Sequence, residues 1–304
     1  MATGALSRVA RVIAVLACCA ACGGPAAEPP IKGASTAPAA AAAQPSDAAQ
    51  AVVTASRGKV ELLHGGAGDW ADVKVGDRLG AKDALRTAVG EADLAVDGVK
   101  VRVHEASRLD LKSVAKGAMR TRIHGSLESE VDKTGKLDVE IEGSDATAFS
   151  QGGHFFVTAD GKGVIAVAAV TGSVHLSGRG KSVEIRKGEV SRIEGAAGAP
   201  SLPAAALRRV LLSVRWPRAQ ETNQATVPIA GRVEPGSRVF VQGQPVMVEA
   251  GGGFRAEVPL KQGKQKIAVV TVDALGRRKQ LESMVKRDDS LPEARVKKKL
   301  WQWH

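Results

Sequence analysis

Apolar and polar residues alternate along two long parts of the chain. Between residues 55 and 195, apolar side chains occupy every second position in segments such as residues 137–141 and 183–185, with charged side chains between them. A period of two places successive side chains on opposite faces of a β-strand. Residues 164–170 are apolar at every position, which predicts a strand buried on both faces. The pattern predicts an all-β fold.

Turn-forming residues separate these segments. Asp97-Gly98 lies inside the alternating stretch 92–103, and this dipeptide predicts a β-hairpin with a type I′ turn. Residues 178–182, Gly-Arg-Gly-Lys-Ser, resemble the end of a phosphate-binding loop. His175 stands where that loop needs glycine, and a strand pattern follows where it needs a helix. We therefore expect a hairpin turn there and no nucleotide site.

A second alternating part spans residues 213–287. Its short apolar segments are separated by turn signals such as Pro235-Gly236 and Gly263. Short strands with regularly spaced turns are typical of a β-sandwich. Between the two parts lies a linker, residues 196–212, which begins with a Pro/Ala-rich break. The sequence thus predicts two β domains, residues 55–195 and 213–287.

The motifs of the first domain occur in a recognisable order. They are Trp70, then Val73-Lys-Val75-Gly-Asp77, then Leu85-Arg-Thr87, the Asp97-Gly98 turn, and finally Gly172-Ser-Val174 followed by Val183-Glu-Ile185. This order resembles the periplasmic domain of FecR, the iron-dicitrate transport regulator. The resemblance covers somewhat under half of the chain and implies an exported β domain with a binding or signal-relay role. Regulators of that family begin with a cytoplasmic anti-sigma segment and a transmembrane helix. This sequence shows neither, so we expect no direct contact with a sigma factor.

The second domain also resembles a known type of module. Its order of Pro-Gly, Gly-Phe, Leu-x-x-Gly and Asp-x-x-Gly, beginning at Pro235, Gly253, Leu260 and Asp273, is similar to bacterial Ig-like modules. Such modules mostly serve as spacers or adhesive surfaces. The resemblance to that fold does not by itself imply sugar binding.

The N-terminal residues are typical of an exported lipoprotein. Arg8 and Arg11 precede an apolar run that is too short to span a bilayer, so residues 1–22 predict a secretory signal peptide. The sequence Ala20-Ala21-Cys22-Gly23 resembles a bacterial lipobox, and we predict acylation of Cys22. Cys18 is the alternative lipidation site, and an ordinary signal peptide with incidental cysteines is the alternative to lipidation. The Ala/Pro-rich residues 23–54 predict a flexible tether.

Composition adds a basic C-terminal end to this picture. The formal net charge is +11, and residues 277–304 hold nine Lys or Arg against four Asp or Glu, an excess of five. Within the tail, residues 288–304, the candidate contacts to an anionic surface are Lys297, Lys298, Lys299, Trp301 and Trp303. A solvated end is the alternative. Aromatic residues make up only 3% of the chain, so we expect Trp70, Trp216, Phe155, Phe156 and Phe254 to be core residues.

The sequence shows no catalytic motif. Its six histidines are dispersed without metal-ligand spacing, and no cysteine follows Cys22, which excludes both a cysteine nucleophile and a disulfide framework. Alternation places Glu128 and Glu130, and likewise Glu140 and Glu142, on solvated strand faces rather than in a desolvated acid pair. We therefore expect no catalytic residues, no metal, no cofactor and no small-molecule substrate.

These observations predict a non-catalytic lipoprotein of the cell envelope that acts as a binding or signal-relay module. It is expected to be held by its lipid in the outer membrane, facing the periplasm or the surface. Its partner would be an envelope protein, a glycan or a peptidoglycan-linked ligand, and not nucleic acid. Two alternatives remain open. One is a periplasmic partner of a transmembrane or sigma-factor regulatory system, and the other is an accessory protein or enzyme of envelope polysaccharide metabolism.

Overall fold

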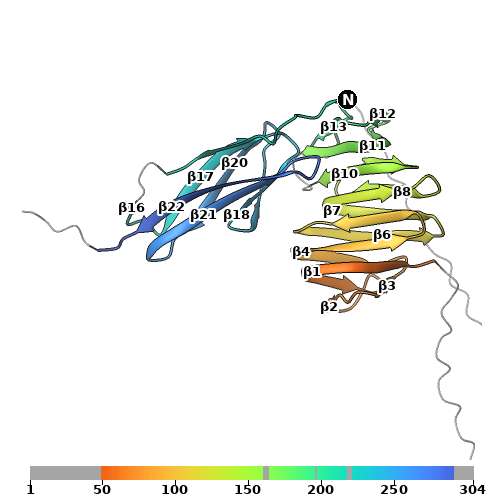
Figure 1. Cartoon of the computed structure of the whole chain (residues 1–304), viewed down its shortest axis with the longest axis horizontal. Helices are drawn as coiled ribbons and strands as arrows, with labels where there is room; N and C mark the ends of the chain where they lie inside the picture. The colour runs from red at the N-terminus through yellow and green to blue at the C-terminus, as the bar shows by residue number, and fades with distance from the viewer. Residues whose placement is uncertain (1–48, 160–163, 196, 218–220, 291–304) are drawn as a thin grey trace, which may run out of the picture. The chain divides into compact units, whose positions relative to one another are not determined.

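The computed structural model describes residues 49–159, 164–195, 197–217 and 221–290, which belong to one compact unit. The described residues form only strands, turns and loops, so the predicted all-β fold is confirmed (Figure 1). In this part of the chain we find no helix long and apolar enough to cross a membrane.

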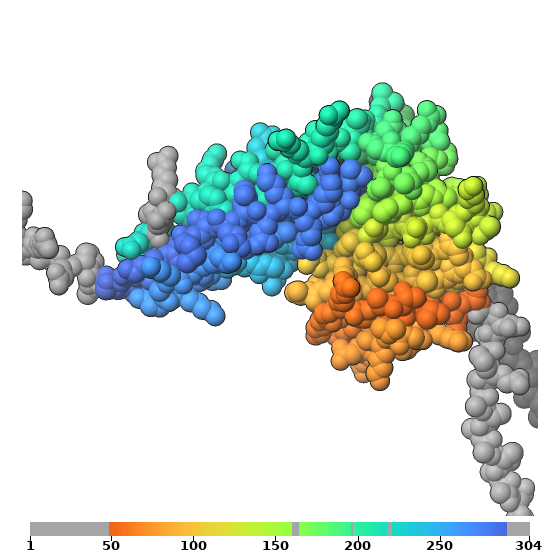
Figure 2. Space-filling model, in the orientation of Figure 1, coloured from red at the N-terminus to blue at the C-terminus, as the bar shows by residue number. Residues whose placement is uncertain are grey.

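The first domain is a single fourteen-stranded sheet. Its strands are β1 (Ala51–Leu63), β2 (Ala71–Asp72), β3 (Arg78–Leu79), β4 (Ala84–Val96), β5 (Val99–Val103), β6 (Ser107–Ala115), β7 (Ala118–Val131), β8 (Lys136–Ile141), β9 (Thr147–Ser150), β10 (Gly153–Ala159), β11 (Val164–Gly178), β12 (Lys181–Arg186), β13 (Glu189–Glu194) and β14 (Ala204–Ala205). Figure 2 shows the colour of this domain changing steadily from orange to green, so strands close in sequence are also close in space.

The sheet is folded into two layers. Four long strands, β1, β4, β7 and β11, run through the fold, and each takes part in both layers. The second half of β7 pairs with β5 and β10, whereas its first half pairs with β6 and, in parallel, with β8. Layer one therefore has the order β3-β1-β4-β5-β7-β10-β11-β13-β14. Layer two has the order β2-β1-β4-β6-β7-β8-β9-β11-β12.

Glycines mark the points where long strands pass between layers. Gly58 in β1, Gly125 in β7 and Gly172 in β11 have positive φ values of 71°, 105° and 68°. A Cβ atom on Gly58 would lie 2.1 Å from the Val89 carbonyl oxygen, so the strands approach too closely for any side chain. Glycine supplies both the backbone conformation and the space that such a bend needs.

The two layers enclose one apolar core. Alternate residues of both layers point into it, for example Val101 of β5, Leu109 of β6, Val139 of β8 and Val157 of β10, all at most 1% exposed. The core is built from Val, Leu, Ile and Ala around Phe155. Trp70, which we expected in the core, packs outside it, with its ring 4.3 Å from the Arg86 guanidinium carbon. Its aromatic face thus serves a cation–π contact.

Strand β11 is buried on both faces, as its apolar sequence predicts. Ile165 and Val167 point into the core between the layers. Ala166 and Ala168 point outward, yet they are 0% exposed, because they form a second small cluster with Val190 of β13 and Ala274 of the second domain. The outer face of β11 is therefore apolar because it is covered by another part of the same chain.

The predicted hairpins are confirmed, but one turn type is wrong. Strands β4 and β5 pair through Val96 and Val99, yet only Gly98 has a positive φ (71°), whereas a type I′ turn needs two such residues. The two-residue turn between β11 and β12 has both, at Arg179 (49°) and Gly180 (70°). The Gly178–Ser182 segment is thus a hairpin turn, as expected.

The second domain is a sandwich of two sheets. A three-stranded sheet has the order β15-β17-β20, and a five-stranded sheet has the order β16-β22-β21-β18-β19. The strands are β15 (Leu212–Arg215), β16 (Glu221–Thr222), β17 (Thr226–Val233), β18 (Arg238–Val241), β19 (Gln244–Val246), β20 (Gly253–Pro259), β21 (Gly263–Val272) and β22 (Arg278–Arg287). Phe254, Ile229 and Ile267 lie in the core between the sheets, and Trp216 packs against it.

Strands begin inside two segments that we expected from the sequence to be a tether and a linker. Residues 51–54, assigned to the tether, begin β1, and Ala51 and Val53 are fully buried in the core. Within the expected linker 196–212, the short strand β14 pairs with β13, and Leu212 opens β15. Short strands with small side chains leave too little pattern to be read from the sequence.

The glycine bends give a test of the two-layer fold. We expect Gly58→Ala to lower the free energy of unfolding by about 2–4 kcal/mol, because it adds a backbone clash to the strain of a positive φ. Gly188→Ala is the matched control, since Gly188 has a similar φ (81°) with no atom within 4 Å of its Cβ position. It should cost only about 1–2 kcal/mol. Equal losses in denaturant unfolding would contradict the close approach at Gly58.

Candidate functional site

The outer face of layer one brings together charged side chains from four neighbouring strands, β4, β5, β7 and β10. In β5, Val101 and Val103 point inward, so Arg102 points outward, and His104 follows at the next outward position. The register pairs Arg102 with Glu128 of β7, and Glu128 with Phe156 of β10. Side chains on one face of paired strands are close neighbours. We call Asp93, Arg102, His104, Glu128 and His154 the Glu128 cluster.

Glu128 lies at the centre of this cluster. His154 Nε2 is 2.8 Å from one carboxylate oxygen of Glu128, and His104 Nε2 is 3.6 Å from the other. Arg102 Nη1 is 3.5 Å from Glu128 and, through Nε and Nη2, Arg102 also donates two hydrogen bonds to Asp93, at 2.7 and 3.0 Å. One carboxylate thus faces two imidazoles and one guanidinium.

Burial affects the protonation of His104. It lowers the pKa of His104, whereas the Glu128 and Glu91 carboxylates act in the opposite direction and Arg102 and Arg238 add to the lowering. The Asp93 carboxylate raises the pKa of Arg102, which stays charged. Both imidazoles pack against Phe156, with ring centroids 6.2 Å away for His104 and 5.3 Å for His154. A neutral His104 beside an anionic Glu128 can gain charge when the pH falls.

The cluster borders a hollow of about 480 Å³ that residues of both domains line. Arg238 of β18 donates hydrogen bonds to the carbonyl oxygens of Glu105 (2.7 Å) and Ala106 (2.9 Å), directly after His104. Arg278 pairs with the Glu105 carboxylate at 2.9 Å. The charges in this hollow are mutually paired, which suits recognition of a polar partner. Among the described residues, no group of three His, Cys, Asp or Glu is placed to hold a metal ion.

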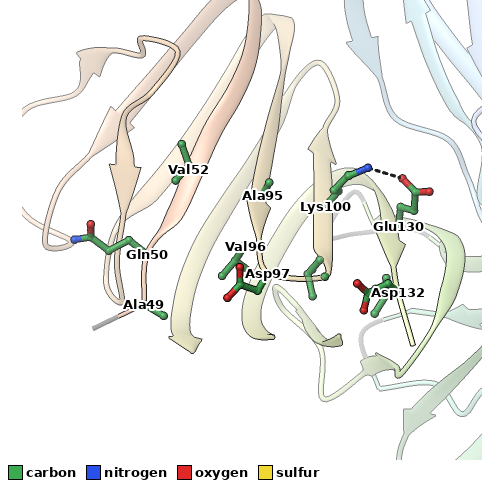
Figure 3. A pocket seen from close by; sticks show the side chains of 12 residues that line it. Ala49, Gln50, Val52, Ala95, Val96, Asp97, Lys100, Glu130 and Asp132 are labelled. Atoms are coloured by element: carbon green, nitrogen blue, oxygen red, sulfur yellow. Dashed lines mark hydrogen bonds and ion pairs between the residues drawn. The ribbon is translucent and has the colours of Figure 1, made fainter. Parts of the chain in front are cut away.

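A second hollow, of about 660 Å³, lies beside the turn that joins β4 to β5 (Figure 3). Its charged side chains are Asp97, Lys100, Glu130 and Asp132, and Lys100 and Glu130 form an ion pair at 3.4 Å. That pair is about 70% exposed, and such surface pairs contribute little stability. Hydrogen bonds from Thr134 lower the pKa of Asp132, which holds the next turn. The lining residues of this hollow include no histidine, serine, threonine or cysteine.

The site residues predicted from the sequence lie outside the described residues. These are the lipidation candidates Cys22 and Cys18 and the surface-contact candidates Lys297, Lys298, Lys299, Trp301 and Trp303. Within the described part, we expected Glu128 to lie on a solvated face, but its side chain is only 22% exposed. The side chain of Glu130 is 67% exposed and fits the expectation.

Sequence reasoning missed the Glu128 cluster for a physical reason. His104, Glu128 and His154 are each separated by more than twenty residues and meet only because β7 pairs with both β5 and β10. Alternation does place each of them at an outward position. The signal that would have found them is the strand order, which the period of two does not contain.

Comparison with known proteins gives weak likenesses of fold. No protein-family model matches the chain. No curated protein matches it either. Two crystal structures of a candidate anti-sigma factor from Parabacteroides distasonis are similar over 40% of this chain and 57% of theirs, at 16% and 17% identity and TM-scores of 0.35 and 0.34. A polysaccharide lyase is similar over 79% of this chain and 40% of its own, at 8% identity and a TM-score of 0.21. The chain thus spans little more than half of the anti-sigma structures.

The half-buried imidazole of His104 predicts a specific pH dependence of stability. Below about pH 6.5 an unfolded His104 takes up a proton that the folded protein resists, so the free energy of unfolding should fall as the pH drops towards the lowered folded pKa. Above about pH 6.5, His104 does not contribute to the change of the free energy of unfolding with pH. We expect His104→Gln to reduce the slope between about pH 7 and 5, by at most about 1.4 kcal/mol per pH unit.

The matched control is His175→Gln, because His175 lies on an exposed position of β11. It should leave the slope as in the unaltered protein. Denaturant unfolding across the pH series measures all three proteins. If His104→Gln and the unaltered protein had the same slope, the burial of a neutral imidazole would be contradicted.

Proposed function

We propose that the chain is a non-catalytic lipoprotein of the cell envelope that binds a partner and relays that binding through its first domain. Acylated Cys22 would hold it in the outer membrane, with residues 23–50 as the tether. The order of motifs from Trp70 to Ile185, which resembles the FecR periplasmic domain, supports an exported module with such a role. The proposed partner is an envelope protein, a glycan or a peptidoglycan-linked ligand.

One observation carries the relay part of the proposal: Arg238 of the second domain is bonded to the residues that directly follow His104. A partner that contacts the Glu128 cluster, or a proton taken up there, changes the charge next to this junction. The ion pair between Arg192 of β13 and Glu234 lies at the same junction. Because these arginines are half-buried, the contacts are less screened by water than surface pairs are.

The charge pairing of Glu140 supports binding over catalysis at that position. Its carboxylate is held by Arg120 (2.8 Å) and Arg122 (2.9 Å). Hydrogen bonds from Arg122 and the charge of both arginines outweigh the opposing effect of burial and lower the pKa of Glu140. A carboxyl group kept ionised in this way is a poor general acid.

The lipid anchor is tested by mass. We expect the mature protein to begin at Cys22 and to carry acyl chains, because Ala20 and Ala21 fit the small-residue pocket of a signal peptidase. Cys22→Ser should abolish acylation, whereas Cys18→Ser should leave it intact. Intact-mass measurement of the three proteins from a bacterial envelope decides this. An acylated Cys22→Ser protein would show that the anchor is another cysteine.

The binding surface is tested by a pull-down from the native envelope with the lipidated protein. We expect a reproducible envelope partner whose retention falls at least about threefold in Glu128→Gln, because hydrogen bonds to charged groups contribute about 1.5–3 kcal/mol. Glu130→Gln is the control, since Glu130 lies on the same strand and face and its ion pair is with the exposed Lys100. Equal retention by both variants would exclude the Glu128 cluster as the contact surface.

A further inference from the structure

Three arginines share the outer face of the three-stranded sheet in the second domain. In β15, β17 and β20 the buried residues alternate with outward ones, and Arg215, Arg232 and Arg255 are all outward and exposed. They surround a hollow of about 630 Å³. No sequence motif marks them, because each comes from a different strand.

The strand register holds the three arginines close together. Arg215 pairs with Ala230, and Ala230 pairs with Arg255, so two strand spacings, about 10 Å, separate these arginines. Arg232 is two residues further along β17, a diagonal distance of about 7–8 Å from either. Side chains as long as arginine can therefore reach the same group. The position between them is occupied only by the small Ala230.

The floor of the hollow is backbone and small side chains. Gly231 and Gly253 lie in it, and the Phe254 ring packs beneath Gly231, where a Cβ atom would be 2.5 Å from the ring. Ser213 lies at its edge. A ligand can thus approach the sheet closely without meeting a large side chain.

These arginines lack the carboxylate partners that the arginines on the strand faces of the first domain have. In the first domain, Arg102 pairs with Asp93 and Arg122 with Glu140. Among the described residues, Arg215, Arg232 and Arg255 form no ion pair, and Arg232 only donates to the Gly251 carbonyl oxygen at 3.4 Å. Glu249 is the one carboxylate that lines the hollow. Three positive charges against one leave the hollow basic.

We propose that this face, the three-arginine face, binds the carboxylate or sulfate groups of an acidic polysaccharide. A guanidinium donates two parallel hydrogen bonds to a planar or tetrahedral oxyanion, and several of them hold repeated anionic groups on one chain. A lipid surface is disfavoured, because none of the exposed large apolar side chains lines the hollow. The proposal names a ligand for the binding role above, but it requires neither the lipid anchor nor the Glu128 cluster.

The test is binding of defined polymers to the full chain with Cys22→Ser, so that no acyl chain contributes. The probes are dextran sulfate and polygalacturonate, with neutral dextran, free sulfate and phosphatidylglycerol vesicles as comparisons. The site variant is Arg215→Gln/Arg232→Gln/Arg255→Gln. The matched control is Arg78→Gln/Arg208→Gln/Arg209→Gln, which removes the same charge from exposed arginines that have no carboxylate partner among the described residues.

We expect both acidic polymers to bind the unaltered and control chains, and the site variant to bind at least about tenfold more weakly. Neutral dextran should not bind. Circular dichroism of the site variant should match that of the control, since all three changes are exposed. Equal weakening by both triple variants would overturn the proposal in favour of non-specific charge. Binding to vesicles but to neither polymer would assign the face to lipid and overturn it as well. If neither acidic polymer bound the chain, this proposal would fail, but the results expected for the Cys22 acylation test and the Glu128 pull-down would not change.

Discussion

The first domain depends on four strands that cross between its layers. A strand that takes part in both layers links their registers. The alternation of core-facing and outward residues along such a strand must fit the neighbouring strands of both layers. Gly58, Gly125 and Gly172 make this possible, since the backbone there adopts positive φ and neighbouring chain passes within contact of the Cα position. A side chain at these positions would have to displace the neighbouring atoms. The single core, with Phe155 and its aliphatic neighbours, follows from that constraint.

The same constraint decides which polar residues meet. Once Val101 and Val157 point into the core, Arg102 and Phe156 must point out, and the pairing of β7 with both β5 and β10 brings Glu128 between them. The outer face becomes apolar further along, at Ala166 and Ala168, where the second domain covers it. The outward side chains of layer one therefore change in character across the sheet. They are charged at β4 to β7, aromatic at β10 and apolar at β11 and β13.

The sequence predicts local structure well and strand order poorly. The all-β class, the β4–β5 and β11–β12 hairpins and the doubly buried β11 follow from period and turn residues alone. The parallel pairing of β7 with β8 does not, because the short turn at Asp132 carries the chain from one layer to the other instead of closing an ordinary hairpin. The candidate site depends on such non-local pairings. It could be predicted residue by residue as outward-facing, but not as a cluster.

The arginines of the chain serve two roles: many are paired within the fold, and three lie unpaired with carboxylates on the three-arginine face. In the first domain, arginines neutralise carboxylates across strands, and Arg192 and Arg238 serve the junction with the second domain through Glu234 and backbone carbonyls. Those guanidiniums are committed to the fold. Around the hollow on the β15-β17-β20 sheet, three arginines lie beside one carboxylate and form no ion pair among the described residues, and Arg232 donates only to a backbone carbonyl. Like charges that close together repel and cost folding energy, and an anionic ligand removes that cost when it binds. The three-arginine face therefore adds little stability by itself and leaves its charge for an anionic ligand.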